Sequence, residues 1–525
     1  MASILQTHAE VIARTLAERN VPYIFGLPGG EIVAFIEACR RAGIRFLLTG
    51  HEASAAWMAQ VTGEITGVPG VCASTLGPGA TNLVTGVANA FLDRAPMLAV
   101  TAQIPKSALA TMTHQRLDLH ALFAPITKAS ISIERKTASD VARAMELAAA
   151  PRPGPVHLSL ASDLAIQECS SSEVFRANES AGNAPAKAIR ERLAAARQPL
   201  VLIGLGATPA MAPAIRAFIA RLKAPFLVTP KAKGIVSEDH PLFLGVASGM
   251  AIDRDIVDTI RIADLVLAIG FDPVECDKTW FAKTEIVSID SASMAEGEYR
   301  PVEAIGEIVR LLTELDMDAN PWPEELAESR RAAIRRRPAE SSAHGLSPLR
   351  VIEELRAAFP RDGTVACDVG SHKLAMGQFW RSYEPATFFM SNGLSGMGFG
   401  LPAAIAAQLA RPEKAVMAVV GDGGMLMMVH DLTLVRELEL PIVIVVFADR
   451  SLSLIRVSES RRGIEPYGVD FRPPDFVKVA EGFGIHARRV AHIKELKNCV
   501  EHAVAGKRPF LIEVPIDHRE YYDLV

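Results

Sequence analysis

The stretch from residue 414 to residue 455 constrains the fold more than any other part of the chain. An apolar run, AVMAVV, leads into GDGG at residues 421–424, and a second apolar run, PIVIVVF, leads into ADRS at residues 448–451. The segment between the two runs has the apolar spacing of a helix. Apolar runs that alternate with helices are typical of parallel strands, which are buried on both faces. The stretch therefore predicts a strand, a helix and a second strand in one parallel sheet.

Asp422 and Asp449 each follow one of these two strands. Parallel strands finish at the same edge of a sheet, where open α/β folds bind ligands, so we expect the two carboxylates to lie side by side. They would repel each other unless a cation lay between them, and the adjacent glycines let backbone amides approach a phosphate. The simplest occupant is a magnesium ion that carries a diphosphate. The alternative is that GDGG is only a tight turn, in which Asp422 caps the next helix.

Length and composition bound the class of protein. A chain of 525 residues is too long for one core and predicts two to four domains. A hydrophobic fraction of 49%, with 22% charged residues, is ordinary for a globular protein rich in helix and parallel sheet. The net charge is −5 and no basic stripe is present, so we expect no nucleic-acid partner.

The apolar runs, the first residues and the cysteines bear on the location of the protein and on metal binding. The longest apolar runs are too short to span a membrane, and the first residues have no apolar signal core, so we expect a cytoplasmic protein with no membrane partner. The six cysteines are scattered without CxxC spacing, which predicts reduced thiols and no zinc site.

Three regions repeat the alternation of strand and helix. Residues 1–165, 186–315 and 347–525 each read as a doubly wound parallel α/β domain. The polar, Ser- and Ala-rich residues 167–186 predict a first linker, and residues 319–345, with prolines and a charged helical segment, predict a second. The arginine run in the second linker is read as a solvated face.

Gly204 and Gly206 in the middle region allow two interpretations. The sequence GLGA after an apolar strand could bind a flavin or another nucleotide, but the complete GxGxxG is absent. A tight turn between strand and helix is the default interpretation.

The segment 421–451 resembles the signature of thiamine-diphosphate enzymes, in which Gly-Asp-Gly is followed at this spacing by an Asn-Asn pair. Ala448-Asp449 stands in place of that pair, so the ligand position is Asp449 and the first Asn is lost. An acidic residue there resembles the catabolic acetolactate synthases. The resemblance implies a pyrimidine-binding, a central and a diphosphate-binding domain, with thiamine diphosphate and Mg²⁺ as cofactors. It implies that Asp422, Asp449 and Ser451 bind the metal.

The resemblance also implies roles for residues outside that segment. Glu52 by itself could be an ordinary acid at a helix N-terminus; in the family the equivalent glutamate hydrogen-bonds the pyrimidine ring, which requires a carboxyl group in a largely apolar pocket. Met397 could be core filling, or the bulky residue that bends the cofactor while the Ser395 carbonyl receives its amine. The residues expected to contact the cofactor are Glu52, Pro78, Asn82, Gly370, Ser371, His372, Ser395, Met397, Gly421, Asp422, Gly423, Gly424 and Asp449.

Other segments bear on the substrate. Residues 113–118 (THQRLD), 270–275 (GFDPVE) and 468–484 closely resemble the catabolic, flavin-independent acetolactate synthases, so FAD is not expected. Related decarboxylases carry adjacent histidines where this chain has His114-Gln115, and benzaldehyde lyase has a histidine where this chain has Pro28. These departures favour a synthase-like pocket, in which we assign a catalytic role to Gln115.

Residues 451–461 differ from the synthases at the segment that covers the active site. Within it, Arg456 could hold a substrate carboxylate or could be an ordinary surface arginine.

The resemblance implies that a 2-oxo acid is decarboxylated and joined to a second carbonyl, as in the formation of 2-acetolactate from two pyruvates. Two other enzyme reactions stay open: simple non-oxidative decarboxylation, and a benzaldehyde-lyase-like ligation of aldehydes. A cofactor-binding homologue without turnover is the alternative outside enzymes. We expect a homodimer or homotetramer in which Glu52 and the metal that share one cofactor come from different chains.

Overall fold

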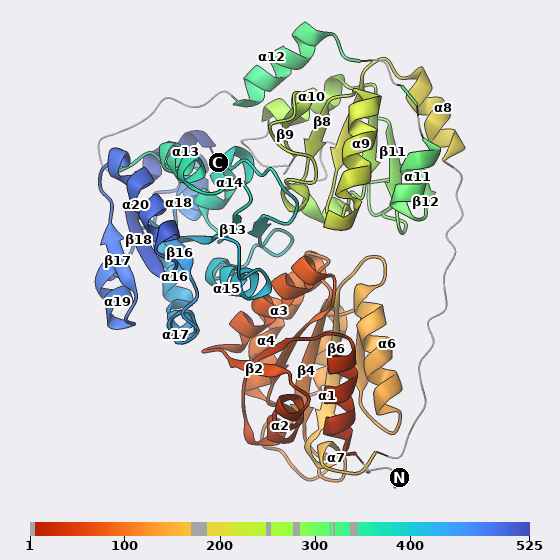
Figure 1. The fold of residues 1–525 in the computed structure, drawn as a ribbon, viewed down its shortest axis with the longest axis vertical. Coiled ribbons are helices and arrows are strands. Elements are labelled where there is room, and N and C mark those ends of the chain that lie inside the picture. Colours follow the sequence, from red (N-terminus) through yellow and green to blue (C-terminus); the bar gives the residue numbers. More distant parts are fainter. Residues whose placement is uncertain are drawn as a thin grey trace. The chain divides into compact units, whose positions relative to one another are not determined.

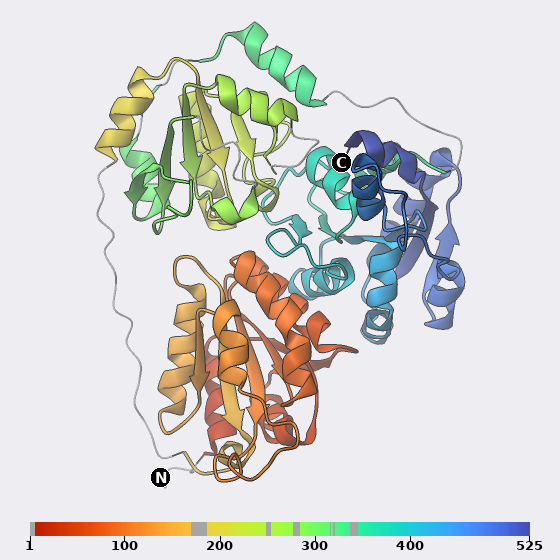
Figure 2. The same ribbon diagram turned by 180° about the vertical axis from the view of Figure 1, so that it is seen from behind.

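The computed structural model describes residues 6–169, 186–247, 254–276, 284–315, 317–318, 321–335 and 345–524. In these residues the long strands form three six-stranded sheets, and all neighbouring strands in them are parallel. Helices cover both faces of each sheet (Figures 1 and 2). The predicted fold class, three doubly wound parallel α/β domains, is confirmed.

The N-terminal sheet has the strand order β2-β1-β3-β4-β6-β5. Its strands are β1 Tyr23–Leu27, β2 Arg45–Leu48, β3 Gly70–Ser74, β4 Met97–Gln103, β5 Ala129–Ser132 and β6 Pro155–Ala161. Its helices are α1 His8–Glu18, α2 Val33–Arg41, α3 Glu52–Thr66, α4 Pro78–Leu92, α5 Leu119–Phe123, α6 Thr137–Ala149 and α7 Ser162–Ala165. Strands β3 and β4 are buried almost throughout, as expected for the centre of a parallel sheet.

The C-terminal sheet has the order β14-β13-β15-β16-β18-β17, which is the same order once each sheet is numbered from its own first strand. Its strands are β13 Thr364–Cys367, β14 Phe388–Met390, β15 Val416–Gly421, β16 Ile442–Ala448, β17 His486–Arg489 and β18 Phe510–Pro515. Its helices are α13 Pro348–Ala358, α14 Ser371–Phe379, α15 Gly400–Ala410, α16 Asp422–Met427, α17 Leu432–Glu437, α18 Ser453–Arg461, α19 Phe476–Gly482, α20 Ile493–Ala505 and α21 Tyr521–Leu524.

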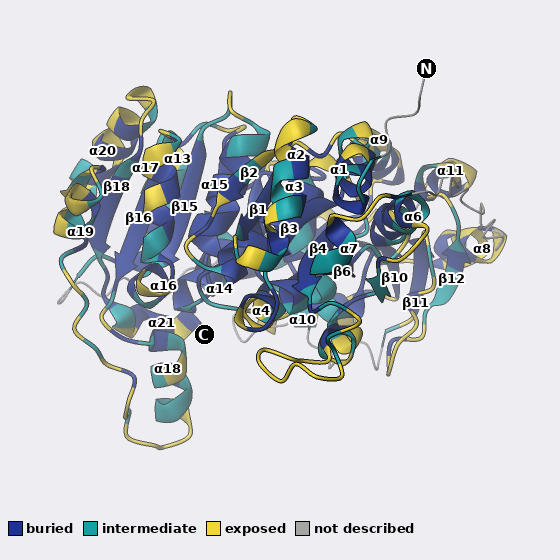
Figure 3. Cartoon of the chain, turned by 90° about the horizontal axis from the view of Figure 1, so that it is seen from below, coloured by how far each residue is buried: buried dark blue, intermediate teal, exposed yellow. Residues whose placement is uncertain are grey.

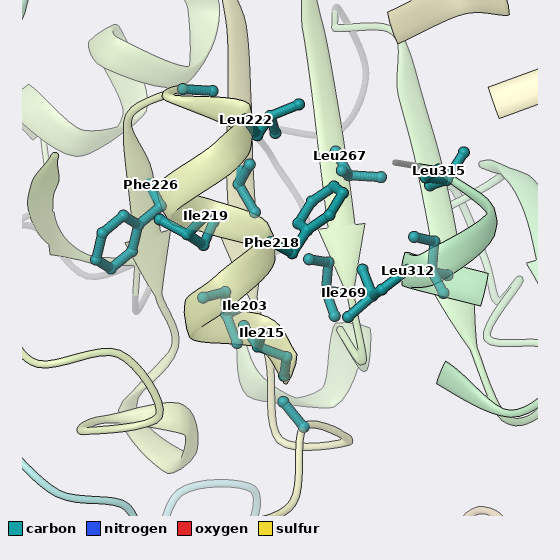
Figure 4. Close-up of a cluster of buried hydrophobic side chains, with 14 of the residues drawn as sticks. Ile203, Ile215, Phe218, Ile219, Leu222, Phe226, Leu267, Ile269, Leu312 and Leu315 are labelled. Carbon is teal, nitrogen blue, oxygen red and sulfur yellow. The ribbon is translucent and has the colours of Figure 1, made fainter. Parts of the chain in front are cut away.

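The central sheet is ordered differently, as β12-β11-β10-β7-β8-β9, with its first strand in the middle. Its strands are β7 Pro199–Ile203, β8 Phe226–Val228, β9 Phe243–Val246, β10 Leu265–Ile269, β11 Ile286–Asp290 and β12 Val302–Ile305. Its helices are α8 Lys187–Ala195, α9 Ala212–Leu222, α10 Arg254–Ile262, α11 Ile308–Glu314 and α12 Glu324–Arg335. Figure 4 shows the core on one face, where Ile215, Phe218 and Ile219 of α9 lie with the strand side chains Ile203 and Leu267.

Helix α12 corrects the second predicted linker. Trp322, Ala327 and Ile334 are buried in a core cluster of the central domain, and the Trp322 indole N–H donates to the Pro199 carbonyl (2.8 Å). Residues 321–335 therefore pack on the central domain instead of running free between domains. The polarity of the segment hid this, because only a few spaced apolar side chains make the contact, Leu326 among them. The first predicted linker lies almost entirely outside the described residues.

The two compact units into which the chain packs do not follow the order of the sequence. One compact unit contains residues 1–179 together with residues 393–412 and 428–438, and the other contains residues 180–392, 413–427 and 439–525. In the first unit α15 packs on α3. Helix α15 is apolar and buried on nearly every side, so it requires cover beyond its own sheet.

The pattern of buried residues matches the layered arrangement of strands and helices. Figure 3 shows buried strands and helices whose outer faces are exposed. In the described part of the chain no helix is both long and apolar enough to cross a membrane. All six cysteines are free thiols, as predicted.

Candidate functional site

The C-terminal sheet brings Asp422 and Asp449 to neighbouring strand ends, as predicted. Strands β15 and β16 pair in parallel with Gly421 opposite Phe447, so Asp422 directly follows one strand while Asp449 follows the other. The Oδ2 atom of Asp422 accepts a hydrogen bond from the Arg450 amide (2.7 Å), which ties the two strand ends together. Strand β16 is buried throughout and consists of β-branched and aromatic residues with one terminal alanine, which explains why this pairing is firm.

The two carboxyl groups carry unfavourable electrostatics. Burial raises the pKa of Asp422 to about 6. Burial and the neighbouring Asp422 carboxylate raise the pKa of Asp449 to about 7. Backbone and hydroxyl donors offset only part of this cost, including the Ser453 hydroxyl, which donates to Asp449 Oδ2 (2.7 Å). A cation between the two carboxylates would remove the repulsion.

The donor set fits magnesium. Among the described residues no three His, Cys, Asp or Glu side chains are arranged to hold a metal by themselves. Mg²⁺ is commonly bound through one or two carboxylates together with phosphate oxygens and water. Two carboxylates at one strand edge are therefore sufficient where a diphosphate supplies further oxygens. Ser451, the third predicted ligand, is buried beside them and pairs through its backbone with Asp470.

Ser371 and His372 lie at the start of α14, after the neighbouring strand β13. Both are buried, and Ser371 Oγ and His372 Nε2 have no hydrogen-bond partner among the described residues. Burial lowers the pKa of His372 to about 4, so the ring is neutral. The ring packs on Phe447 (5.7 Å between centroids) and close to Gly421. Buried polar atoms without partners at the same sheet edge as the acidic pair fit a phosphate that would bond to them.

Asp368 is a residue that the sequence interpretation missed. It directly follows β13 and is fully buried. A Cβ placed on Gly424 would lie 1.8 Å from Asp368 Oδ2, so only glycine fits at that position. The signal was present, because Asp368 follows an apolar strand in the same way as Asp422 and Asp449. Gly424, the last glycine of GDGG, is therefore required because a third acid, Asp368, lies at this edge of the sheet.

Glu52 begins helix α3 in the first compact unit. It is 4% exposed, and Asn82 Nδ2 donates to its Oε2 atom (2.9 Å). The His51 side chain caps the helix by accepting from the Ala53 amide. Asn82 is the fifth residue of α4, which starts at Pro78, so two predicted cofactor residues are in direct contact. The burial expected for Glu52 is observed.

Gln115 lies in an exposed segment between β4 and α5. Its backbone is left-handed (φ 54°), and its side chain lies against Gly77, the residue before Pro78. This contact brings Gln115 to the turn that begins α4. Such a backbone conformation is uncommon for a residue other than glycine and is often found at functional sites.

Ser395 and Met397 lie on the turn between residues 393 and 398, which packs with α3 and α4. Ser395 is exposed and left-handed (φ 56°), and Met397 is half-buried. A half-exposed methionine is not ordinary core filling. Trp57 of α3 lies beside Gly396 and makes an edge contact with Phe399, which fixes the turn on the helix that begins with Glu52.

Arg456 is paired. Its guanidinium forms an ion pair with Asp470, which is 59% exposed. This arrangement favours the interpretation of Arg456 as a structural arginine over a role in holding substrate.

The glycines of the central sheet have a packing explanation. A Cβ on Gly204 would lie 2.5 Å from the Phe271 Cα atom, so the turns after β7 and β10 touch. Between them lies Glu275, 4% exposed, whose carboxyl oxygens accept from the Leu205 amide (2.8 Å) and the Lys231 amide (3.3 Å). Burial raises the pKa of Glu275 to about 8. The amides that a nucleotide phosphate would need are therefore already bonded to a side chain.

The predicted residues fall into two sets. Glu52, Pro78, Asn82, Gln115, Ser395 and Met397 lie in the first compact unit, and Gly370, Ser371, His372, Gly421, Asp422, Gly423, Gly424, Asp449 and Ser451 lie in the second. Their roles as ligands remain predictions.

Comparison with known proteins identifies three family domains along the chain. Residues 6–122 match the model of the thiamine pyrophosphate enzyme N-terminal TPP-binding domain, residues 186–315 the central domain and residues 368–514 the C-terminal TPP-binding domain. The chain is 32% identical to an acetolactate synthase of Bacillus subtilis (strain 168), over 98% of this chain and 94% of that protein.

Two further relatives cover nearly the whole chain. One is the large subunit of acetolactate synthase isozyme 2 of Escherichia coli (strain K12), 32% identical over 98% of this chain and 96% of that protein. The other is a probable 2-ketoarginine decarboxylase of Pseudomonas aeruginosa, 29% identical over 97% of this chain and 94% of that protein.

Proposed function

The chain belongs to the thiamine pyrophosphate enzyme family, and from that premise we propose that it decarboxylates a 2-oxo acid and joins the remaining fragment to a second carbonyl. With pyruvate as both substrates the product is 2-acetolactate. The observation that carries the proposal is the pair Asp422 and Asp449 at neighbouring strand ends. The acetolactate synthases among the relatives support the choice of reaction.

In this proposal Asp422 and Asp449 hold Mg²⁺, and Ser451 adds an oxygen ligand. Ser371 and His372 face the diphosphate, because their buried polar atoms have no partner among the described residues. A neutral His372 ring can donate one hydrogen bond without adding charge. A metal held there would offset the negative charge of the acidic pair and of the phosphates.

Thiamine diphosphate, when bound, would supply a carbon nucleophile that adds to the ketone carbon and a ring that accepts the electron pair released with carbon dioxide. In this proposal the buried Glu52 carboxyl group would hydrogen-bond the pyrimidine ring of the cofactor. Asn82 orients that carboxyl group through its hydrogen bond to Oε2. Proton transfer by a positioned side chain contributes about 10²- to 10⁴-fold in general acid–base catalysis.

Gln115 is assigned to the substrate. Its exposed amide lies at the turn before Pro78, and it can donate to the carboxylate or carbonyl of a 2-oxo acid. Ser395 and Met397 are assigned to the shape of the bound cofactor, which they would hold bent.

Simple decarboxylation is the second candidate. It is favoured by the Arg456–Asp470 ion pair, which leaves Arg456 engaged and not directed at the carboxylate of an acceptor acid. One relative, moreover, is named as a probable decarboxylase. Purified protein incubated with thiamine diphosphate, Mg²⁺ and pyruvate, followed by NMR of the products, separates the two. Acetolactate supports the synthase and acetaldehyde supports decarboxylation.

Further 2-oxo acids and aldehydes extend the same test. Ligation of aromatic aldehydes without a 2-oxo acid would indicate the lyase-like reaction. Absence of carbon dioxide from every 2-oxo acid, in protein that binds the cofactor, would indicate a homologue without turnover.

We also propose that the enzyme works without flavin. The Glu275 carboxyl group occupies the amides at the middle of the central sheet, and contact between two turns accounts for Gly204. A diphosphate would have to displace Glu275 to bind there.

The active sites are proposed to be shared between copies. One cofactor must reach both Glu52 and the metal, and pairing the N-terminal domain of one chain with the C-terminal domain of a twin satisfies this twice under two-fold symmetry. Mixing inactive Glu52→Gln chains with inactive Asp422→Ala chains tests it, because shared sites put both lesions into one site and leave the other intact. Activity should return. Mixed dimers, verified by two affinity tags, that stay as inactive as their parents would contradict sharing.

A further inference from the structure

A buried polar network joins the end of α4 to the turn between residues 393 and 398. Asp93 caps α4 and is 3% exposed. Its Oδ1 atom accepts from the Gly393 amide (2.7 Å), and its Oδ2 atom accepts from Gln60 Nε2 (3.1 Å) and Asn89 Nδ2 (3.2 Å). Gln60 and Asn89 are fully buried, and Asn89 also donates to Gln60 Oε1 (2.7 Å). One carboxylate thus gathers donors from α3, from α4 and from the turn.

The turn is in direct contact with the end of α4, where this network lies. A Cβ on Gly393 would lie 2.6 Å from Leu92 Cβ, so the backbone of Gly393 touches the end of α4. Two residues later Ser395 adopts its left-handed backbone, a conformation that persists only where the surroundings fix it. The bond from Gly393 to Asp93 is charge-assisted and buried, which places it among the stronger restraints of this kind.

We propose that Asp93 is a positioning residue for the turn from Gly393 to Gly398. By holding the Gly393 amide it sets where Ser395 and Met397 stand, and thereby the affinity for the bent cofactor. The inference rests on the proposed function, because that function supplies the ligand. Helix α4 would then serve cofactor binding at both ends, through Asn82 near its start and Asp93 at its C-terminal cap.

The substitution Asp93→Asn separates this role from packing. It keeps the size of the side chain but has only one acceptor oxygen. With Gln60 and Asn89 oriented as they are, the new amide nitrogen faces either their donors or the Gly393 amide. The control is Glu64→Gln, since Glu64 accepts from Gln60 Nε2 (2.8 Å) at the far end of the network.

The first measurement is calorimetric titration of cofactor-free protein with thiamine diphosphate in excess Mg²⁺. We expect Asp93→Asn to raise the dissociation constant about tenfold, the loss of one hydrogen bond to a charged group. The KM for the 2-oxo acid at saturating cofactor should stay within about twofold, because the substrate does not contact Asp93. Glu64→Gln should match wild type. An unchanged dissociation constant in folded Asp93→Asn overturns the inference.

Hydrogen exchange gives a readout that needs no bound cofactor. Amide exchange in the peptide covering residues 393–398 should accelerate in Asp93→Asn while the peptide covering residues 78–88 stays as in wild type. Equal exchange in the first peptide overturns the inference. If wild type fails to bind thiamine diphosphate, the proposed function fails, and the exchange result still decides whether Asp93 holds the turn.

Asn89→Leu is the second variant, for the case that Asp93→Asn does not fold. It removes one donor to Asp93 Oδ2 and leaves the bond from Gly393 in place. The variant also removes the bond to Gln60 Oε1. A smaller rise in the dissociation constant, about threefold, is expected, because the bond from Gly393 to Asp93 remains. No rise in this variant would count against the network.

Discussion

The carboxyl edges of the central and C-terminal sheets differ in how they treat acidic side chains. At the central edge Glu275 is held by two backbone amides, and the neighbouring turns touch. At the C-terminal edge Asp422 and Asp449 face each other across neighbouring strands, and polar atoms of Ser371 and His372 have no partner among the described residues. Both edges belong to parallel six-stranded sheets in the described chain. The acid at the central edge is bonded to backbone amides, whereas the C-terminal edge is the one at which we propose that a ligand binds.

The difference shows how to interpret glycine motifs. Gly204 and Gly424 both allow close approach, but Gly204 meets the backbone of another turn while Gly424 meets the carboxyl group of Asp368. A glycine that faces backbone closes a site. Gly424 instead lets the GDGG turn pass close to the buried carboxyl group of Asp368.

The largest effect is expected from Asp422→Asn. Removing one of two carboxylate ligands should lower activity at least about 100-fold at low Mg²⁺. The thermal midpoint of the cofactor-free protein should not fall, because the repulsion with Asp449 is removed as well. Steady-state assays over a range of Mg²⁺, with a melting curve of the same sample, check both statements. Near wild-type activity at low Mg²⁺ would remove the contrast between the two edges.

Glu275→Ala should have the opposite profile. It leaves the Leu205 and Lys231 amides without their side-chain acceptor and opens a small cavity, which should destabilise the protein by about 2–4 kcal/mol. Affinity for thiamine diphosphate should stay within about twofold, since the amides concerned belong to a different sheet. Urea denaturation and calorimetry measure the two quantities. Loss of cofactor affinity with unchanged stability would reverse the assignment of the two edges.

The pH dependence of stability should also differ between Glu275→Gln and wild type. This difference should be smaller than the destabilisation expected for Glu275→Ala. Burial raises the pKa of Glu275 to about 8, above about 4.3 in the unfolded chain, so the folded state binds the proton more tightly. Its contribution is full below about pH 4 and is lost as the pH rises towards 8. The variant has no proton to lose, so its stability should fall less over this window. Parallel curves for the two proteins would contradict the raised pKa.

Added FAD is expected to have no effect on the protein. Purified protein should be colourless, and added FAD should not shift its thermal midpoint, because Glu275 already occupies the amides. Glu275→Ala is the matched variant for this test. A stoichiometric yellow chromophore released by heating wild type would show that the central edge is open.

Local sequence patterns predicted much of this architecture. The runs AVMAVV and PIVIVVF became neighbouring strands because β-branched residues buried on both faces suit few other structures. Their shared edge then placed Asp422 beside Asp449. The same logic applied to β13 would have found Asp368.

Other features depend on contacts between segments distant in the chain. The packing of α15 on α3 and the bond from Gly393 to Asp93 join residues about 300 positions apart, and no local pattern encodes them. Helix α12 was read as a linker because its charged face dominates its composition, while only a few side chains reach the core. The default interpretation of Gly204 and Gly206 as a tight turn agrees with the close approach to the turn after β10.

The central claim is that Asp422 and Asp449 hold the metal that retains thiamine diphosphate. Calorimetric titration of cofactor-free wild type and Asp449→Ala, each with Mg²⁺ and with EDTA, tests it directly. Wild type should bind one cofactor per chain only with Mg²⁺, and Asp449→Ala should lose at least about 100-fold in affinity while it stays folded. Equal, Mg²⁺-dependent binding by the two proteins would contradict the claim.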